Sequence, residues 1–315
     1  MPNSLRPVPL STPTHPADAL AAAITRIGSP ICVGLDPVLE QLPSDIRARH
    51  YEPLAAIAEF CRGVLAAIAG IVPAVKFQSA CFERYGGKGV TLLEELSEHA
   101  AASGLIVVWD AKRGDIGISA SHYAAAAKRM HAHFITVSGY LGMSGVTPFL
   151  DAGLGVFVLV RTSNPDSDAV QSPRLADGRT VGEMMADAVA ALGGGESRKG
   201  ACGLSAAGAV VGATKSGEGA SLRQRMPDHI FLMPGYGAQG GTAADIRSMV
   251  RPDAEFPGVL VTSSRAIIYA PPLANQPWPQ AVQSAAKLMA AEIAGVLASD
   301  SRNPRISCTN DVREK

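Results

Sequence analysis

Short apolar segments alternate along most of the chain with segments whose apolar residues recur at helical spacing. The short segments are typical of buried parallel strands. They lie at Ile31–Leu35, Ile71–Phe77, Leu105–Val108, His133–Val137, Gly155–Val160, Ala209–Gly212, Ile230–Met233 and Val259–Thr262. The segments with helical spacing lie at 51–69, 91–102, 119–130, 146–152, 181–192, 221–226, 242–250 and 280–297. Strands that alternate with helices in this way predict a parallel α/β fold.

Polar residues at the ends of these strands distinguish between two parallel folds. Asp36 follows the first strand, Lys76 ends the second, Asp110 follows the third, Ser163 the fifth and Arg265 the last. In a (β/α)8 TIM barrel all strands end at one mouth, where the active sites of that fold lie. An open doubly wound sheet would use similar elements, but no G-x-G-x-x-G motif follows the first strand. We therefore predict a (β/α)8 barrel.

The barrel is predicted to occupy residues 19–297 as one domain. Residues 1–18 contain five prolines and no apolar segment of the kind found in signal peptides, so we expect a flexible arm. The connection from about 164 to 208 is too long for a simple crossover and is interpreted as an insertion. Residues 298–315 are polar and show no periodicity, which predicts a disordered tail.

Composition and charge narrow the classes of function. The 28 basic and 28 acidic residues cancel, so we expect no nucleic-acid partner and no anionic membrane surface. No uninterrupted apolar run reaches the roughly 18 residues of a membrane span. The five cysteines are scattered without a C-x-x-C pair, which favours a reducing cytoplasm over a zinc ribbon or a disulfide framework. His131 and His133 lie where a helix meets a strand, and we predict no metal site there.

The third strand ends in three charged residues. Asp110 and Lys112 are two residues apart, so an extended strand would project both side chains to the same side. Asp115 follows Gly114, where the chain can turn. Charges at the end of an apolar strand are costly unless they pair with each other or meet a ligand. Taken alone, this pattern fits either a salt bridge at a strand end or a reactive site.

A glycine-rich segment follows the seventh strand. Residues 234–241 contain four glycines, whose backbone N–H groups can approach an anion, and the next helix adds its dipole. Arg265, after the eighth strand, supplies a guanidinium group. Because many barrels bind a substrate phosphate after strands seven and eight, we predict a phosphate site here. The alternative is a plain turn beside a surface arginine.

In combination these motifs resemble orotidine 5′-phosphate decarboxylase. The resemblance rests on Asp-x-Lys-x-x-Asp at 110–115, the lysine that ends the second strand, and Pro-Gly-x-Gly-x-Gln-Gly-Gly at 234–241. The motifs VGLDP at 33–37 and RTSNP at 161–165 are similar to its longer bacterial (type 2) subfamily. The resemblance implies a cytoplasmic homodimeric barrel without metal or organic cofactor. Its reaction converts orotidine 5′-monophosphate to UMP and carbon dioxide, the last step of pyrimidine nucleotide synthesis.

The resemblance also implies a charged tetrad at matching positions. Its members would be Lys76, Asp110, Lys112 and Asp115, with Asp115 donated across the dimer interface into the partner's site. Loss of carbon dioxide from C6 leaves a carbanion whose lone pair cannot delocalise into the ring. An ammonium group fixed at that carbon can stabilise and then protonate it, which is a task for Lys112. The two aspartates would keep Lys112 charged, and Lys76 would offset the second carboxylate.

Further positions match residues that bind the substrate in this family. They are Asp36, Ser119, Ser163, Gln239, Arg265, Gly237 and Gly240. Asp36 would contact ribose hydroxyls, and Ser119 would reach the ribose of the partner's site, where the family usually has threonine. Ser163 would bind the pyrimidine and Gln239 would bridge base and phosphate. Arg265 would hold the phosphate.

Two other functions remain open from the sequence. A magnesium-dependent sugar-phosphate decarboxylase or synthase of the same barrel superfamily shares Asp-x-Lys-x-x-Asp. Such enzymes place a glutamate near the position of Lys76 as a metal ligand, whereas a lysine repels a divalent cation. A non-catalytic phosphate-binding barrel is the second alternative, which the complete tetrad disfavours.

Overall fold

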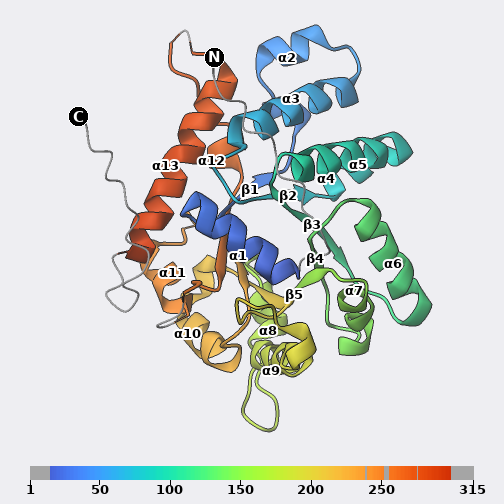
Figure 1. Ribbon diagram of the computed structural model, residues 1–315, viewed down its shortest axis with the longest axis vertical. Coiled ribbons are helices and arrows are strands. Elements are labelled where there is room, and N and C mark those ends of the chain that lie inside the picture. The colour runs from blue at the N-terminus through green and yellow to red at the C-terminus, as the bar shows by residue number, and fades with distance from the viewer. Residues whose placement is uncertain (1–14, 238–239, 252–254, 275, 299–315) are drawn as a thin grey trace.

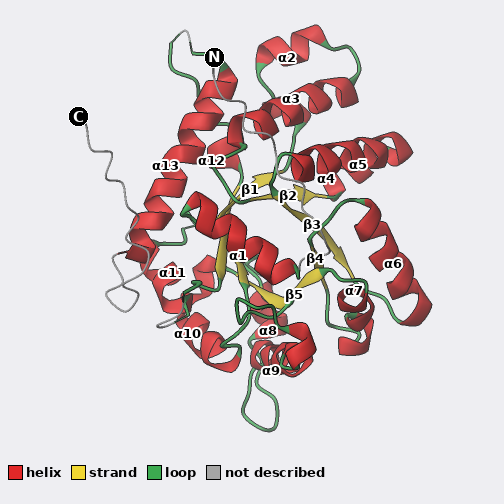
Figure 2. Ribbon diagram, in the orientation of Figure 1, coloured by secondary structure: helices red, strands yellow, loops and turns green. Residues whose placement is uncertain are grey.

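The computed structural model describes residues 15–237, 240–251, 255–274 and 276–298. Eight parallel strands close into a barrel in sequence order, which confirms the predicted fold (Figures 1 and 2). The strands are β1 (Ile31–Leu35), β2 (Ala74–Gln78), β3 (Ile106–Arg113), β4 (Phe134–Val137), β5 (Gly155–Arg161), β6 (Ala207–Val211), β7 (Phe231–Met233) and β8 (Val259–Ser263). The last strand pairs with the first, with Ile31 opposite Val261.

Helices cover the outside of the strands, as Figure 2 shows. The α-helices in chain order are α1 (Pro16–Ile27), α2 (Ser44–Arg49), α3 (Pro53–Ile68), α4 (Ala80–Glu83), α5 (Gly86–Ala102), α6 (Gly117–Arg129), α7 (Thr147–Asp151), α8 (Ser167–Gln171), α9 (Val181–Gly193), α10 (Ser216–Arg225), α11 (Ala243–Met249), α12 (Arg265–Ile268) and α13 (Trp278–Ala298), and α1 lies apart from this outer layer. The strands are mainly apolar because both of their faces are buried, and most of their polar residues lie toward the carboxyl ends. In β3, Val107 and Trp109 pack outward with the helices, whereas Ile106 and Val108 pack inward.

Helix α1, which the sequence pattern did not predict, covers the amino ends of the strands. Leu20 and Ala23 pack with inward residues of the barrel, among them the stacked rings of Phe134 and Phe157. Figure 1 shows α1 lying across the ring of strands. The helix begins at Pro16, so its first turn falls within the range predicted as a flexible arm. Residues 1–14 of that arm, and the predicted tail beyond Ala298, lie outside the described residues.

The predicted insertion, 164–208, contains α8, a turned-back segment and α9. Helix α9 packs against β5 and β6 and is therefore the barrel's own crossover helix. It begins at a capping box in which Thr180 accepts the N–H of Glu183 and the Glu183 side chain accepts the N–H of Thr180. Between α8 and α9, Arg174 and Thr180 form an antiparallel bridge. The additions to a simple crossover are thus α8, this turned-back segment, and a second turned-back segment after α9 in which Lys199 and Ser205 form an antiparallel bridge.

The histidine pair at 131 and 133 has a structural explanation. His133 is partly buried, and its Nδ1 accepts the backbone N–H of Val107 at 3.1 Å. Burial is the main cause that lowers the pKa of His133 to about 4, so the ring is neutral at pH 7 and can accept this hydrogen bond. The residue therefore supports the start of β4.

By length and composition alone, α13 is apolar enough to cross a membrane. In the structure it packs along α3 and contacts α11, α12 and β1. Its buried residues are Ala281, Val282, Ala286, Ile293, Val296 and Leu297. This packing makes α13 the outer helix of the last strand–helix unit of the barrel.

Candidate active site

A cavity of about 540 Å³ lies at the carboxyl ends of the strands. Each of the eight strands contributes a lining residue, either within the strand or directly after it. The predicted site residues that line it are Asp36, Lys76, Asp110, Lys112, Ser163 and Arg265. A second cavity, of about 590 Å³, lies between α2 and the start of α13 and contains none of the predicted residues. The first cavity is therefore the candidate active site, because it is the one that the predicted residues line.

Asp110 is the centre of the charged group in this cavity. Its Oδ2 accepts a hydrogen bond from Lys76 Nζ at 2.7 Å, and its Oδ1 accepts one from Lys112 Nζ at 2.6 Å. Lys76 Nζ also lies 3.7 Å from Asp36 Oδ1. Three of the four predicted tetrad members thus meet within one chain, with Asp36 beside them.

The two buried members hold each other in their charged forms. Burial alone would raise the pKa of Asp110, but the charges and hydrogen bonds of Lys76 and Lys112 outweigh it and hold the pKa below its usual value. Burial alone would likewise lower the pKa of Lys76, but the carboxylates of Asp110 and Asp36 raise it above its usual value. Both groups are therefore ionised at neutral pH, and Asp110 can fix the ammonium group of Lys112.

The backbone at Lys112 explains how its side chain reaches Asp110. Lys112 has φ of 45°, in the left-handed region that is uncommon and strained outside glycine. The register between β3 and β4 shifts over the same stretch, between Trp109 and Arg113. The prediction that Asp110 and Lys112 lie together is right, but an irregular strand end brings them together rather than simple alternation. The side chain of Lys112 is 49% exposed and faces the cavity.

Thr136 and Gln78 line the site, but the sequence motifs did not predict them as site residues. Thr136 Oγ1 donates to Asp110 Oδ1 at 2.8 Å and accepts the backbone N–H of Lys112 at 2.9 Å. Gln78 Nε2 lies 3.5 Å from Asp110 Oδ2 and is a weaker donor. The available signal for Thr136 was a single hydroxyl within an otherwise apolar strand. It supports both the carboxylate and the strained backbone of Lys112.

Asp115 and Ser119 do not line the cavity of their own chain. The Asp115 carboxylate accepts the backbone N–H of Ile116, its neighbour, at 2.8 Å. Ser119 lies in the first turn of α6 and is partly buried. Within a single chain, the fourth member of the predicted tetrad is therefore separate from the other three.

The predicted phosphate region is assembled only in part. Arg265 begins α12 at the cavity and makes no ion pair within the described part of the chain. Gly237 and Gly240 do not line the cavity; the Gly237 N–H donates to Gly241 O, and the Gly240 N–H donates to Gly237 O. Binding of an anion by these amides would require the turn to reopen. Gln239 lies outside the described residues.

Comparison with known protein families identifies the family to which this chain belongs. The model of the orotidine 5′-phosphate decarboxylase / HUMPS family matches residues 29–276. The chain belongs to this family. It is 43% identical to the orotidine 5′-phosphate decarboxylase of Rhodopirellula baltica, over 81% of this chain and 88% of that protein. The Deinococcus radiodurans protein of the same name is 39% identical, over 82% and 90% of the two chains.

A solved structure gives the same result. The OMP decarboxylase of Leishmania donovani superposes with a TM-score of 0.71 at 31% sequence identity, covering 90% of this chain and 98% of that one. The family inferred from the sequence motifs is thus confirmed. Its longer bacterial subfamily stays a prediction.

The hydroxyl of Thr136 can be tested by replacing it with a methyl group of similar size. We expect Thr136→Val to lower the free energy of unfolding by about 1–3 kcal/mol, because it removes a donor from buried Asp110 and the acceptor of the Lys112 N–H. Urea denaturation would measure the difference. The same substitution at Thr91, which is exposed on α5, is the matched control and should change stability by no more than about 0.5 kcal/mol. Equal effects at both positions would contradict this role.

Proposed function

We propose that Lys112 stabilises and protonates the carbanion formed when this chain decarboxylates orotidine 5′-monophosphate to UMP. Family membership and the similarity to named decarboxylases support the reaction, which belongs to pyrimidine nucleotide synthesis. The observation that carries the proposed role of Lys112 is its ammonium group, held 2.6 Å from Asp110 at the cavity. No other lysine in the described chain combines access to this cavity with an exposed side chain.

The proposed reaction requires a positively charged group beside C6 of the pyrimidine ring. The bond between C6 and the carboxylate breaks, carbon dioxide leaves, and the electron pair stays on C6 in the plane of the ring. The Lys112 ammonium stabilises this charge and then transfers a proton to C6, giving UMP and a neutral amine that solvent reprotonates. Asp110 keeps the ammonium in place before the reaction, so little reorganisation is needed when the charge develops.

The remaining residues of the cavity suit the other parts of the nucleotide. Asp36 Oδ1 is buried and has no hydrogen-bond partner among the described residues, so a ribose hydroxyl could satisfy it. Ser163 lines the cavity after β5 and is assigned to the pyrimidine. Arg265 is assigned to the phosphate, together with the glycine-rich turn and Gln239. Binding energy from the phosphate would then contribute to ordering the site around C6.

A homodimer would complete the tetrad. Ile116, Ile118, Tyr140 and Leu141 are apolar residues beside Asp115 that are each more than half exposed. The two chain segments 115–118 and 140–145, which carry these residues, are in contact, because Gly145 lies against the backbone of Asp115 so closely that a side chain would not fit. An exposed apolar patch of this kind is typical of an interface between protein chains. We infer that a second copy covers this patch and that Asp115 and Ser119 then reach the partner's cavity.

The charges in the cavity also support a reaction without a metal. The Lys76 ammonium occupies the space between the carboxylates of Asp36 and Asp110, where a cation bound by both would lie. A divalent ion there would be repelled by Lys76 and, at the cavity side, by Lys112. These residues favour the decarboxylase over the magnesium-dependent alternative. We further propose a cytoplasmic location, supported by the free thiols of Cys32, Cys61, Cys81 and Cys202.

Replacing the proposed proton donor tests the assignment directly. We expect Lys112→Ala to lower kcat by at least about 10³-fold while the protein stays folded, because both charge stabilisation and proton transfer are lost. The fall in ultraviolet absorbance as orotidine 5′-monophosphate is consumed measures the rate. Lys88→Ala, at an exposed position of α5, is the matched control and should leave kcat unchanged.

The same assay distinguishes the two alternative functions. With a chelator present, the unmodified chain should keep its full rate, whereas a magnesium-dependent enzyme would lose it. A protein that binds UMP but never consumes orotidine 5′-monophosphate would be a non-catalytic barrel. A Lys112→Ala variant that turned over at a substantial rate would remove Lys112 from the mechanism.

The phosphate assignment predicts an effect that depends on the ligand. Arg265→Ala should raise KM for orotidine 5′-monophosphate by about 10- to 100-fold, the scale of one lost charge-assisted contact. The same variant should leave kcat/KM for orotidine, which lacks the phosphate, within about twofold of the unmodified chain. Steady-state kinetics with both substrates would measure this. An equal loss with both would show that Arg265 acts on the fold of the site and not on the phosphate.

Mixed dimers can test whether Asp115 acts across the interface. Lys112→Ala and Asp115→Ala chains should each be inactive alone. When they are unfolded together and refolded, half of the dimers should be hybrids, each with one site that combines an intact Lys112 with the partner's intact Asp115. We expect about a quarter of the unmodified activity. Lys112→Ala mixed with Asp110→Asn is the control and should recover none, because these residues share one chain. No recovery in the first mixture would place Asp115 in its own chain's site or outside catalysis.

A further inference from the structure

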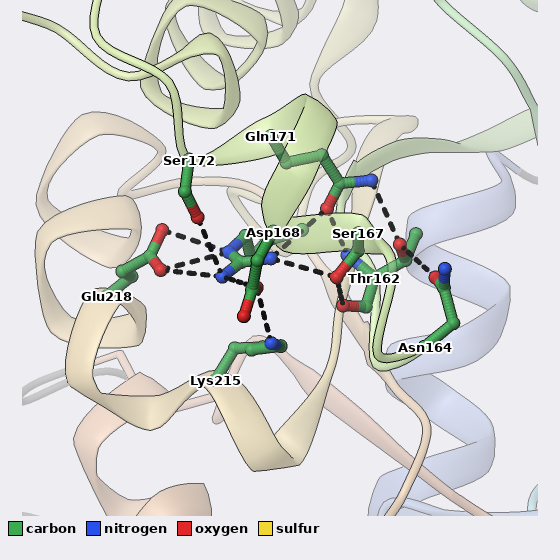
Figure 3. Close-up of polar contacts among 9 residues, drawn as sticks. Thr162, Asn164, Ser167, Asp168, Gln171, Ser172, Lys215 and Glu218 are labelled. Carbon is green, nitrogen blue, oxygen red and sulfur yellow. Dashed lines mark hydrogen bonds and ion pairs between the residues drawn. The ribbon is translucent and has the colours of Figure 1, made fainter.

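Arg161, the last residue of β5, is buried next to the cavity without lining it. Its residual exposure is 2%, and its side chain points outward between the elements that follow β5 and β6. Its nitrogens donate to the side-chain oxygens of Ser167, Asp168, Gln171, Ser172 and Glu218. Figure 3 shows these acceptors gathered from α8, the segment after it and α10. A buried cation with so many partners is costly to build and calls for an explanation beyond a surface ion pair.

Two of these acceptors connect Arg161 to its neighbour Thr162. Gln171 Oε1 accepts the backbone N–H of Thr162 at 2.8 Å, and Ser167 Oγ donates to the Thr162 carbonyl at 3.0 Å. The same two side chains accept from Arg161 Nη1, at 3.0 Å for Ser167 and 3.5 Å for Gln171. Both backbone polar groups of Thr162 are therefore fixed through side chains that Arg161 holds in place.

The network continues along the segment that faces the cavity. Gln171 Nε2 donates to Thr162 Oγ1 at 2.9 Å, and Thr162 Oγ1 donates to Asn164 Oδ1 at 2.7 Å (Figure 3). Ser163, between them, packs against Gly212, where a Cβ atom would lie 2.9 Å from that of Ser163. The Gly212 N–H in turn donates to the Arg161 carbonyl at 2.7 Å. The position of Ser163 is thus determined from both sides.

We propose that Arg161 is a positioning residue for recognition of the pyrimidine: it fixes 162–164 so that Ser163 meets the base in one orientation. The proposal rests on the proposed assignment of Ser163 to the base. Arg161 does not touch the cavity and acts only through Ser167, Gln171 and the backbone of Thr162.

The charges of the network explain why arginine suits this position. Asp168 and Glu218 are both paired with Arg161, and Lys215 Nζ supplies a second cation to Asp168 at 2.6 Å. The two cations and two carboxylates balance. A lysine at 161 would preserve this balance, but one ammonium group cannot reach acceptors on three sides as the planar guanidinium does. Arg161→Lys therefore keeps the charge and removes the geometry.

Binding of two ligands that differ only in the base tests the proposal. Calorimetry with UMP and with ribose 5-phosphate would compare Arg161→Lys with the unmodified chain. We expect UMP to bind at least about 10-fold more weakly and ribose 5-phosphate to bind within about twofold of its original affinity. Arg179→Lys is the matched control, because Arg179 also pairs with two carboxylates in the insertion, Asp177 and Asp187, and should change neither affinity. Equal weakening of both ligands, or of neither, would overturn the proposal.

A milder variant and a double variant make the test robust. Ser167→Ala breaks one link between Arg161 and Thr162 while leaving the buried cation in place, and should weaken UMP selectively by a smaller factor. In a Ser163→Ala background, Arg161→Lys should lose most of its effect on UMP, because both changes act on one contact. Persistence of the full effect there would refute the route through Ser163. If Ser163→Ala alone left UMP binding unchanged, the base assignment itself would fail, and the proposal with it.

Discussion

The site depends on one buried carboxylate that stays ionised between two ammonium groups. Asp110 is 7% exposed, and without Lys76 and Lys112 its charge would be strongly disfavoured at that depth. Removing either lysine would therefore change more than one contact, because the pKa of the Asp110 carboxyl group would rise as well. This coupling makes the three residues a single unit whose charge state is set by the fold and not by any one side chain.

The barrel supplies the rigidity that this arrangement requires. Helix α1 covers the end of the barrel opposite the cavity, and the stacked rings of Phe134 and Phe157 fill its interior. Strands β3 and β4 are therefore packed against a solid core beneath the cavity. Strain at the positive φ of Lys112 persists because Thr136, on β4, accepts its N–H and donates to Asp110. A flexible support would relax this backbone, and the ammonium group would move away from Asp110.

The sequence was sufficient to predict elements that repeat along the chain or that are fully buried. All eight strands could be located because each is an apolar run, and the charged strand ends then followed from the parallel topology. Helix α1 was missed because its alanines and its position after several prolines gave no clear period, and α8 and α12 are too short to show one. Helix α5 begins at Gly86 rather than near 91; its first turn contains three glycines and so shows no apolar period. Gly89 lies against the carbonyl of Phe82, where a side chain would not fit. Such close approaches are properties of the tertiary fold.

The site was predictable in composition but not in geometry. Asp110 and Lys112 of the Asp-x-Lys-x-x-Asp motif do meet in the charged centre, yet no sequence signal reveals a left-handed backbone at a lysine. Asp115 is separate from Lys112 within one chain, so its place in the tetrad stays a prediction. Thr136 was overlooked because one hydroxyl in an apolar strand shows no pattern, although it lines the cavity. Arg161 was overlooked because it meets the candidate substrate site only through other residues. Positions of this kind become visible only when hydrogen-bond partners are known.

The two ends of the cavity differ in how firmly they are built. The segment after β5 is held by a buried arginine and two polar side chains, so the groups assigned to the base are in place before a ligand arrives. At the other end, the N–H groups of Gly237 and Gly240 donate to carbonyl groups of the same glycine-rich turn. Arg265 has no ion pair in the described chain. A phosphate would have to reorganise that turn, and the energy for this would come from its own charge. The two proposed assignments therefore differ in kind: the site proposed for the base is rigid, and the site proposed for the phosphate is adaptable.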